Sequence, residues 1–267
     1  ITASAGTSNF RAGVNAGDAI ASGGNFNVVV GDESGTDLTT GDKNTLLGYA
    51  AGANTTTASN NTFIGSESGF TNITGTSNVG VGYRSLLTST GNSNTAVGYE
   101  SGTAITTGTF NTAVGTQAGL NLTTGAFNTF LGAFVGDAIT TANSNVAVGY
   151  LALSTDTLGA KNVAVGVSAL LTQNFTTATD SFNTGVGHNA GKLITTGVGQ
   201  TLIGGLAGDA ITTGADNTAV GYQALTTNQT SANNTAVGVS ALKLNTGADN
   251  TAVGRGALLN QAAGSDN

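Results

Sequence analysis

The sequence of 267 residues has no Cys, Pro, Met or Trp, only one His, and only 8% charged residues. Without Cys, a disulfide framework and thiolate-ligated metals or clusters are excluded. The net charge of −7 argues against nucleic acid and anionic membranes as partners. No apolar run reaches the roughly eighteen residues that a membrane-spanning helix needs. The hydrophobic content of 39% is nevertheless too high for a disordered chain.

Gly, with 42 residues, is abundant and belongs to one short repeat. The frame Asn-Thr-Ala-Val-Gly that begins at Asn94 recurs along the whole sequence, and we number its first residue position 0. Position 0 falls at Asn9, Asn27, Asn44, Asn61, Asn78, Asn94, Asn111, Asn128, Asn145, Asn162, Asn183, Gln200, Asn217, Asn234 and Asn250. Most intervals are 17 residues, and the longest, from Asn162 to Asn183, is 21. Because the frame would restart at Asn267, we expect a piece of a longer array.

The period decides the predicted fold. A unit of 17 residues is too short for the helix pairs of the common α-helical arrays. β-Branched residues at +1 and aliphatic residues at +3 predict strands, and Gly and Asn interrupt each run before a helix could form. We therefore predict an all-β protein: a parallel β-solenoid of about fifteen 17-residue coils, one repeat per coil, with residues 1–267 forming a single array.

Three columns of the repeat have a direct physical interpretation. Position +4 is Gly in every copy, which predicts a corner with positive φ or a close backbone contact. Position +3 is aliphatic in every copy, so we expect it to point into the coil. The Asn column at position 0 predicts a ladder of hydrogen-bonded side-chain amides along the stack. Turn chemistry, in which Asn tolerates tight bends, is the alternative.

Positions +8 and +11 vary together. Copies with Leu at +8 have a polar residue at +11, and most copies with Gly at +8 have an aliphatic residue there. The +8 leucines are Leu86, Leu153, Leu170, Leu225, Leu242 and Leu258, and the +11 aliphatics are Ile20, Leu38, Ile105, Leu122, Ile139, Ile194 and Ile211. We infer that one large side chain fills one core slot per coil from either position. Thr55 and Asn72 depart from this rule, and Ile73 is expected to fill the slot of its coil.

Position +2 suggests self-association. It is apolar in nearly every copy, as in Val29, Leu46 and Phe63, although it lies on the strand face opposite to +3. A strand that is apolar on both faces is buried on both. We therefore predict that +2 meets another copy of the chain in a homo-oligomer, with a trimer favoured. A flattened coil whose own far wall covers +2 is the alternative.

The repeat unit also resembles a known type of repeat. Residues 217–225, Asn-Thr-Ala-Val-Gly-Tyr-Gln-Ala-Leu, resemble the repeats that precede intramolecular-chaperone domains in phage tail-fibre and related bacterial surface proteins. The unit is similar as well to the head repeats of trimeric autotransporter adhesins, whose shorter repeats form left-handed parallel β-rolls associated as trimers. The resemblance covers essentially the whole chain. It implies an extended fibre or adhesin shaft on a virion or a cell surface.

The sequence offers no motif for catalysis, for a cofactor or for a metal. A uniform coil has no long insertions from which to build a concave active site. The single His188 has Asp180 and Ser181 nearby in sequence, but no nucleophile elbow or oxyanion motif accompanies them. The calcium-binding glycine-rich nonapeptide and the EF-hand loop are absent. We therefore expect a protein that is not an enzyme and that has no catalytic, metal or cofactor residues.

One column could contact a ligand. Position +5, directly after the invariant Gly, holds all five tyrosines and the histidine: Tyr49, Tyr83, Tyr99, Tyr150, His188 and Tyr222. Other copies have residues such as Ser66, Thr116 or Val167 there, so the fold does not require an aromatic ring. Tyr83 and Tyr99 belong to consecutive coils, and their rings could stack at about 5 Å and face a sugar ring. The alternative is that the tyrosines shield the corner of the coil or pack between chains.

Together these observations predict a non-enzymatic structural rod, a fragment of a longer fibre protein such as a phage tail fibre, a surface adhesin or an extracellular filament. Its expected partners are copies of itself and a cell-surface glycan or receptor, without nucleic acid and without membrane insertion. The expected location is extracellular, at the cell surface or on a virion. The alternative function is a solenoid binding module that presents a regular face to glycan or, through its recurring Thr-Thr pairs, to ice.

Overall fold

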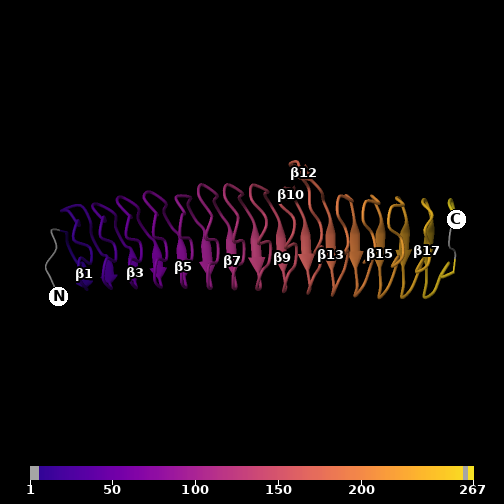
Figure 1. The fold of residues 1–267 in the computed structure, drawn as a ribbon, viewed down its shortest axis with the longest axis horizontal. Helices are drawn as coiled ribbons and strands as arrows, with labels where there is room; N and C mark the ends of the chain where they lie inside the picture. The colour runs from indigo at the N-terminus through magenta and orange to yellow at the C-terminus, as the bar shows by residue number, and fades with distance from the viewer. Residues whose placement is uncertain (1–5, 261–263) are drawn as a thin grey trace. The chain divides into compact units, whose positions relative to one another are not determined.

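A computed structural model describes residues 6–260 and 264–267 of the chain. Within these residues there is no helix, and the strands are two or three residues long and pair in parallel (Figure 1). Each three-residue strand occupies positions +1 to +3, and turns form the rest of each coil. The predicted β-solenoid is confirmed. The chain divides into two compact units, Ile1–Asn128 and Thr129–Asn267, both built from the same coil.

In the first unit, each strand pairs with the strand of the next coil in chain order. The strands are β1 (Phe10–Ala12), β2 (Val28–Val30), β3 (Thr45–Leu47), β4 (Thr62–Ile64), β5 (Val79–Val81), β6 (Thr95–Val97) and β7 (Thr112–Val114). Each residue of the frame lies beside its equivalent in the next coil, so that Ala96, for example, pairs with Ala113. The sequence columns are therefore real rows of residues along the stack.

The second unit continues the same pattern and adds one small sheet. Its main strands pair in order, and β10 pairs with β12 separately. The strands are β8 (Thr129–Leu131), β9 (Val146–Val148), β10 (Gly159–Ala160), β11 (Val163–Val165), β12 (Thr179–Asp180), β13 (Thr184–Val186), β14 (Thr201–Ile203), β15 (Thr218–Val220), β16 (Thr235–Val237) and β17 (Thr251–Val253).

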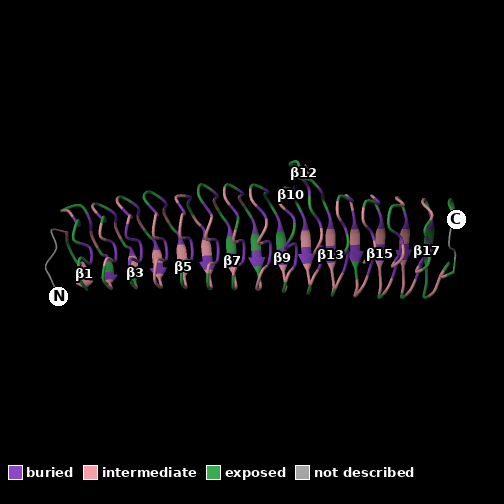
Figure 2. Cartoon of the chain, in the orientation of Figure 1, coloured by how far each residue is buried: buried purple, intermediate pink, exposed green. Residues whose placement is uncertain are grey.

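The expectation that +3 points into the coil is wrong. The middle residue of the main strands, position +2, is buried except for the half-buried Arg11, whereas +1 and +3 are exposed or half-buried in every coil (Figure 2). Val29, Leu46 and Phe63 are fully buried in the coil itself, and Leu47 and Leu131 at +3 are 43% and 47% exposed. The alternative for +2, a coil that covers this column with its own wall, is the correct one. Positions +1 and +3 therefore form the outer face of the sheet.

The core slot is confirmed and is shared by a third column. The side chains of Leu86 at +8 and Ile105 at +11 are both buried. A Cβ added at Gly208 would lie 2.8 Å from Cδ1 of Ile211, so a side chain at +8 would occupy the space that +11 fills. Position +2 also contributes, because it is Ala or Gly wherever +8 is Leu. Three positions thus contribute to one core, in which a side chain at +8 competes for space with +2 and with +11.

In the two exceptional coils a large +2 side chain lies beside the Gly at +8, as it also does in the coils of Phe130 and Leu202. A Cβ at Gly69 would lie 2.4 Å from the Phe63 ring, and one at Gly52 would lie 2.8 Å from Leu46. Because the coils of Phe130 and Leu202 keep a buried Ile at +11, the size of +2 does not account for Thr55 and Asn72.

Thr55 and Asn72 are themselves buried at +11. The expectation for Ile73 is wrong, because its side chain is 47% exposed. Asn72, one residue earlier, is the buried residue of that coil.

The invariant Gly at +4 is required for two reasons at once. Its φ lies between 123° and 138° in all copies, a region that other residues rarely adopt. A Cβ at Gly98 would also lie 2.4 Å from the carbonyl oxygen of Gly115 in the next coil. Adjacent coils therefore meet backbone to backbone at this corner, and both physical reasons predicted from the sequence are confirmed.

The predicted ladder of side-chain amides is also confirmed. The backbone N–H and the Nδ2 of Asn111 donate to Oδ1 of Asn94 at 3.0 and 3.1 Å, and Asn128 binds Oδ1 of Asn111 in the same way. Nδ2 of Asn111 donates further to the carbonyl of Gly125 at 2.8 Å. These asparagines are buried, so each bond is made out of contact with water. Position 0 thus joins consecutive coils through backbone and side chain together.

The ladder has a defect at Gln200, the one residue of the column that is not Asn. Its backbone N–H still donates to Oδ1 of Asn183 at 2.9 Å, and its Nε2 donates to the carbonyl of Gly214 at 2.7 Å. The longer side chain places Oε1 where it accepts no hydrogen bond in the described part of the chain, although the atom is buried. Asn217 accordingly makes no ladder bond to Gln200 there.

The longest repeat and the coil before it together form a second small sheet in the described part of the chain. Strand β10 closes the coil before the long interval, and β12 lies within that interval, in the segment that projects beyond the neighbouring coils (Figure 1). The fully buried carboxylate of Asp156 holds this segment. It accepts hydrogen bonds from the backbone N–H of Gly159 at 3.0 Å, from that of Phe175 at 3.2 Å and from Nε2 of Gln173 at 2.6 Å.

The defect at Gln200 gives a test of the ladder. Gln200→Asn should restore the missing acceptor and raise the free energy of unfolding by about 1–3 kcal/mol, the cost of one unsatisfied buried polar group. The reverse change in a regular coil, Asn111→Gln, should lower it by a similar amount. Chemical denaturation of the two variants and the wild type measures both effects. Equal stability of all three would show that the ladder contributes nothing.

Candidate functional site

The tyrosine column lies on the surface, as its sequence position predicts. Tyr49, Tyr83, Tyr99, Tyr150 and Tyr222 are all exposed, and so is His188. They follow the Gly at +4, where the chain leaves the strand and turns the corner of the coil. Their side chains therefore flank the exposed +1 and +3 columns along one edge of the sheet.

Within this column the structure brings two tyrosines together. The rings of Tyr83 and Tyr99 stack with centroids 5.5 Å apart and an interplanar angle of 22°, which confirms the predicted stack. Cζ of Arg84 lies 5.0 Å from the centroid of the Tyr83 ring. Arg84 also pairs with Glu67 at 2.6 Å. A cation over an aromatic face adds roughly 0.5–1 kcal/mol at an exposed site.

A row of charged and amide side chains at +6 runs beside the stack. It consists of Glu67, Arg84, Glu100 and Gln117, and Nε2 of Gln117 donates to Glu100 at 2.8 Å. The hydrogen bond and the negative charge of Glu67 raise the pKa of Arg84. The negative charge of Glu100 raises the pKa of Tyr99, so both side chains keep their protons at neutral pH. The stack is therefore a neutral aromatic surface beside a row of alternating charge.

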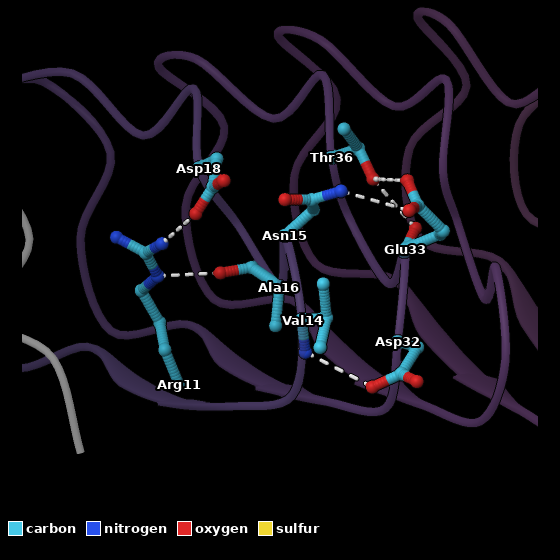
Figure 3. A network of polar contacts seen from close by, with 8 residues as sticks. All are labelled: Arg11, Val14, Asn15, Ala16, Asp18, Asp32, Glu33 and Thr36. Carbon is cyan, nitrogen blue, oxygen red and sulfur yellow. Dashed lines mark hydrogen bonds and ion pairs between the residues drawn. The ribbon is translucent and has the colours of Figure 1, made fainter.

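Tyr49 lies at a cleft of about 380 Å³ in the first unit. Glu33, Thr36 and Asp37 line one side, Ala50 and Ala53 contribute apolar surface, and Asn54 and Phe70 complete the lining. Figure 3 shows how Glu33 is fixed: Asn15 donates to Oε1 at 2.8 Å, and the Thr36 hydroxyl donates to its carbonyl oxygen at 2.7 Å. This cleft could not be predicted from the sequence, because its residues come from three coils.

Arg11 is the one charged residue at +2. Its side chain is 11% exposed, and Nε donates to the carbonyl of Ala16 at 2.5 Å while the guanidinium pairs with Asp18 (Figure 3). The carboxylate thus balances the cation that stands in the core column of this coil. This pair has a structural role and does not contribute to the tyrosine column.

The remaining members of the column are not gathered into one site. Tyr150 contacts Phe134 edge to face, with centroids 6.2 Å apart. The hydroxyl of Ser181 bonds to Oδ1 of Asn162 at 2.8 Å, and Asp180 pairs with Lys161 at 2.6 Å. No hydrogen bond joins His188 to either residue in the described part of the chain. The neighbours in sequence are therefore not assembled as a catalytic triad.

Acidic side chains are scattered along the coils. Among the residues that the structure describes, no three His, Asp or Glu side chains gather in a way that could hold a metal ion. Asp137 and Asp209 share position +9 in separate coils, and partial burial raises the pKa of each carboxyl.

Residues 6–260 and 264–267 contain no helix that is long and apolar enough to cross a membrane.

The fold places the chain among the parallel β-solenoids. Comparison with family models, with curated proteins and with solved structures finds no match to the chain.

The stacked pair allows a test of the contact column. In this test Tyr83 and Tyr99 are both replaced by Ser, which occurs naturally at +5 as Ser66. The double substitution should remove an aromatic interaction worth about 0.5–1.5 kcal/mol and leave the coil folded. If the column contacts glycans, binding on a glycan array should fall while thermal unfolding changes little. A strongly lowered melting temperature with unchanged binding would show that these rings only pack.

Proposed function

We propose that the chain is a non-enzymatic structural rod, a segment of an extracellular, cell-surface or virion fibre, that assembles with copies of itself through the outer face of its sheet. One observation carries the proposal. Positions +1 and +3 point outward, and in fifteen copies they contain only Thr and apolar residues and no charge. A sheet face that contacts solvent normally carries polar residues. The outer face of this sheet instead has the composition of a face that is covered by another layer or chain.

The exposed apolar side chains concentrate on this face and on the two columns that flank it. Among the described residues, nearly all exposed large hydrophobics lie at +1, at +3 or in the flanking columns −1 and +5, and the exceptions are Ile73, Leu193, Leu244 and Leu258. The flanks include Phe110 and Phe127, whose rings stack 5.4 Å apart, as well as the tyrosine column. Contiguous apolar surface of this kind marks an interaction site on a soluble protein.

A second copy of the chain is the partner that fits this surface. The rows repeat at the inter-strand spacing of about 4.8 Å, and only a partner with the same spacing can place one row against each coil. A second copy of the chain has the same spacing, because it consists of the same stacked coils. The net charge of −7 does not oppose the contact, because charged residues are excluded from +1 and +3. The resemblance to adhesin heads favours three chains around one axis.

The fibre location and the attachment role depend on the resemblance to tail-fibre and adhesin repeats. A second candidate function, a binding module for glycan, is favoured by the Tyr83–Tyr99 stack and by the cleft beside Tyr49. The ice-binding variant of that function is disfavoured. The hydroxyls of Thr39, Thr106 and Thr195 donate to carbonyls of the next coil, so they are not arranged for water.

Sedimentation tests the assembly. At micromolar concentration the wild type should sediment as a multiple of 25.9 kDa, with three chains expected. Val114→Lys with Val220→Lys places two charges on the +3 column and should shift the protein towards the monomer. Thr107→Lys with Thr213→Lys adds the same charge at exposed positions away from this face and should change nothing. A folded wild-type monomer would contradict the proposal.

A further inference from the structure

A uniform array presents nearly the same surface at every coil, so a specific site is expected where the repeat is broken. The break is the 21-residue interval from Asn162 to Asn183. A cleft of about 320 Å³ lies beside it in the second unit. Its lining comes from three consecutive coils, the last of which is the long one that contains β12: Thr141, Ala142, Asn143, Leu158, Ala160, Ala178, Thr179 and Asp180.

The loop that forms this cleft is held from within. Asp156 is buried and accepts the three hydrogen bonds described above. Gln173, which donates one of them, accepts from Nδ2 of Asn183 at 2.8 Å and so joins the loop to the amide ladder. Buried polar networks whose members are satisfied hold a single geometry. The cleft is therefore preformed, which reduces the entropy that a ligand would lose on binding.

The cleft is lined by apolar side chains and by a set of polar side chains, the polar rim. Ala142, Leu158, Ala160 and Ala178 supply methyl groups, and hydroxyl, amide and carboxylate groups come from Thr141, Asn143, Thr179 and Asp180. Asp180 is paired with Nζ of Lys161 at 2.6 Å. The charges of the rim thus cancel, so the cleft favours a neutral ligand over an anion or a cation.

An aromatic ring lies next to this rim. Nζ of Lys161 is 5.1 Å from the centroid of the Phe182 ring, and the same ammonium pairs with Asp180. Phe182 is 58% exposed and has a φ of 50°, a left-handed conformation that costs a Phe side chain energy. The same column holds Ser, Lys, Asn and Asp in other coils, so the coil does not require an aromatic residue there.

We propose that this cleft binds a single neutral sugar ring in the pyranose form. Such a ring has C–H groups that match the alanine and leucine walls, and hydroxyls around it that both donate and accept. Asp180 can only accept, whereas Asn143 and the threonine hydroxyls can do both. Bonds from ligand hydroxyls to a carboxylate are of the stronger, charge-assisted kind. A volume of about 320 Å³ is at the lower end for ligand pockets, which suits one ring and no longer chain.

The proposal does not depend on self-association, since all the groups belong to one chain. The probes are the methyl α- and β-pyranosides of glucose, galactose, mannose and N-acetylglucosamine, tested against the full chain by saturation-transfer NMR and titration. For a ligand of this size, a dissociation constant on the order of millimolar is expected. The oligomeric state is measured on the same samples, so failure of assembly and failure of binding are separate results.

Three substitutions place the binding in the cleft. Asp180→Ala removes the carboxylate acceptor, Phe182→Ser removes the ring, and Ala178→Trp fills the cleft. Asp180, Phe182 and Ala178 are exposed, and Ser already occupies the Phe182 column at Ser144, so the coil should remain folded by circular dichroism. Phe26→Ser is the matched control, because Phe26 has the same position and is 57% exposed in a regular coil.

The expected result is that at least one pyranoside binds the wild type and the Phe26→Ser variant equally. The affinity should fall at least about tenfold in the three cleft variants. If no pyranoside of the panel binds the wild type, the proposal is overturned. It is equally overturned if Asp180→Ala and Ala178→Trp bind as the wild type does, because the sugar would then lie elsewhere.

Discussion

The hydrogen bonds between asparagine side chains at position 0 are the interaction on which the coil depends. Each amide accepts from the backbone of the following coil and donates to a carbonyl of that coil's preceding turn, as Asn111 does towards Asn128 and Gly125. A strand of three residues forms few backbone hydrogen bonds with its neighbours. The side-chain amide at position 0 therefore helps to fix the alignment of one coil with the next. Once position 0 is aligned, every later position of the coil is aligned as well.

Two further constraints follow from this alignment. Because adjacent coils are held at strand spacing, the corner after the strand brings backbone against backbone, and only Gly fits at Gly98 and its equivalents. Because the coil is small, a Leu at +8 excludes a large side chain at +2 and an aliphatic one at +11. Leu86 accompanies Gly80 at +2, whereas Phe63 accompanies Gly69 at +8. The variation between coils is therefore compensated within each coil.

Most of the fold could be predicted from the sequence because the same repeat unit occurs fifteen times. The period, the strands, the ladder and the Gly corner all appear as columns, and the structure confirms them. The orientation of +2 and +3 could not be predicted from their composition, since both are apolar and a three-residue strand shows no alternation. One signal did contain the answer: large residues at +2, such as Phe63 and Phe130, occur only where +8 is Gly.

The candidate sites were less predictable for a physical reason. The exposed column of Tyr83 and Tyr99 is a property of one repeat position, so the sequence shows it directly. The clefts beside Tyr49 and beside Asp180 draw their residues from neighbouring coils and from a loop whose shape depends on the buried Asp156. Spacing along the chain does not show such a surface. The long interval after Asn162 indicated where the coil changes, but not what the change forms.

The central claim is that the buried amide ladder holds the coils together, and solvent exchange of side-chain amide protons tests it most directly. Asn60 and Asn61 are neighbours in sequence, yet Asn60 is exposed and Asn61 is buried in the ladder. In deuterated buffer, the Nδ2 protons of Asn61 should persist long after those of Asn60 have exchanged, because they open only when coils separate. Equal, rapid exchange at both residues would contradict the ladder.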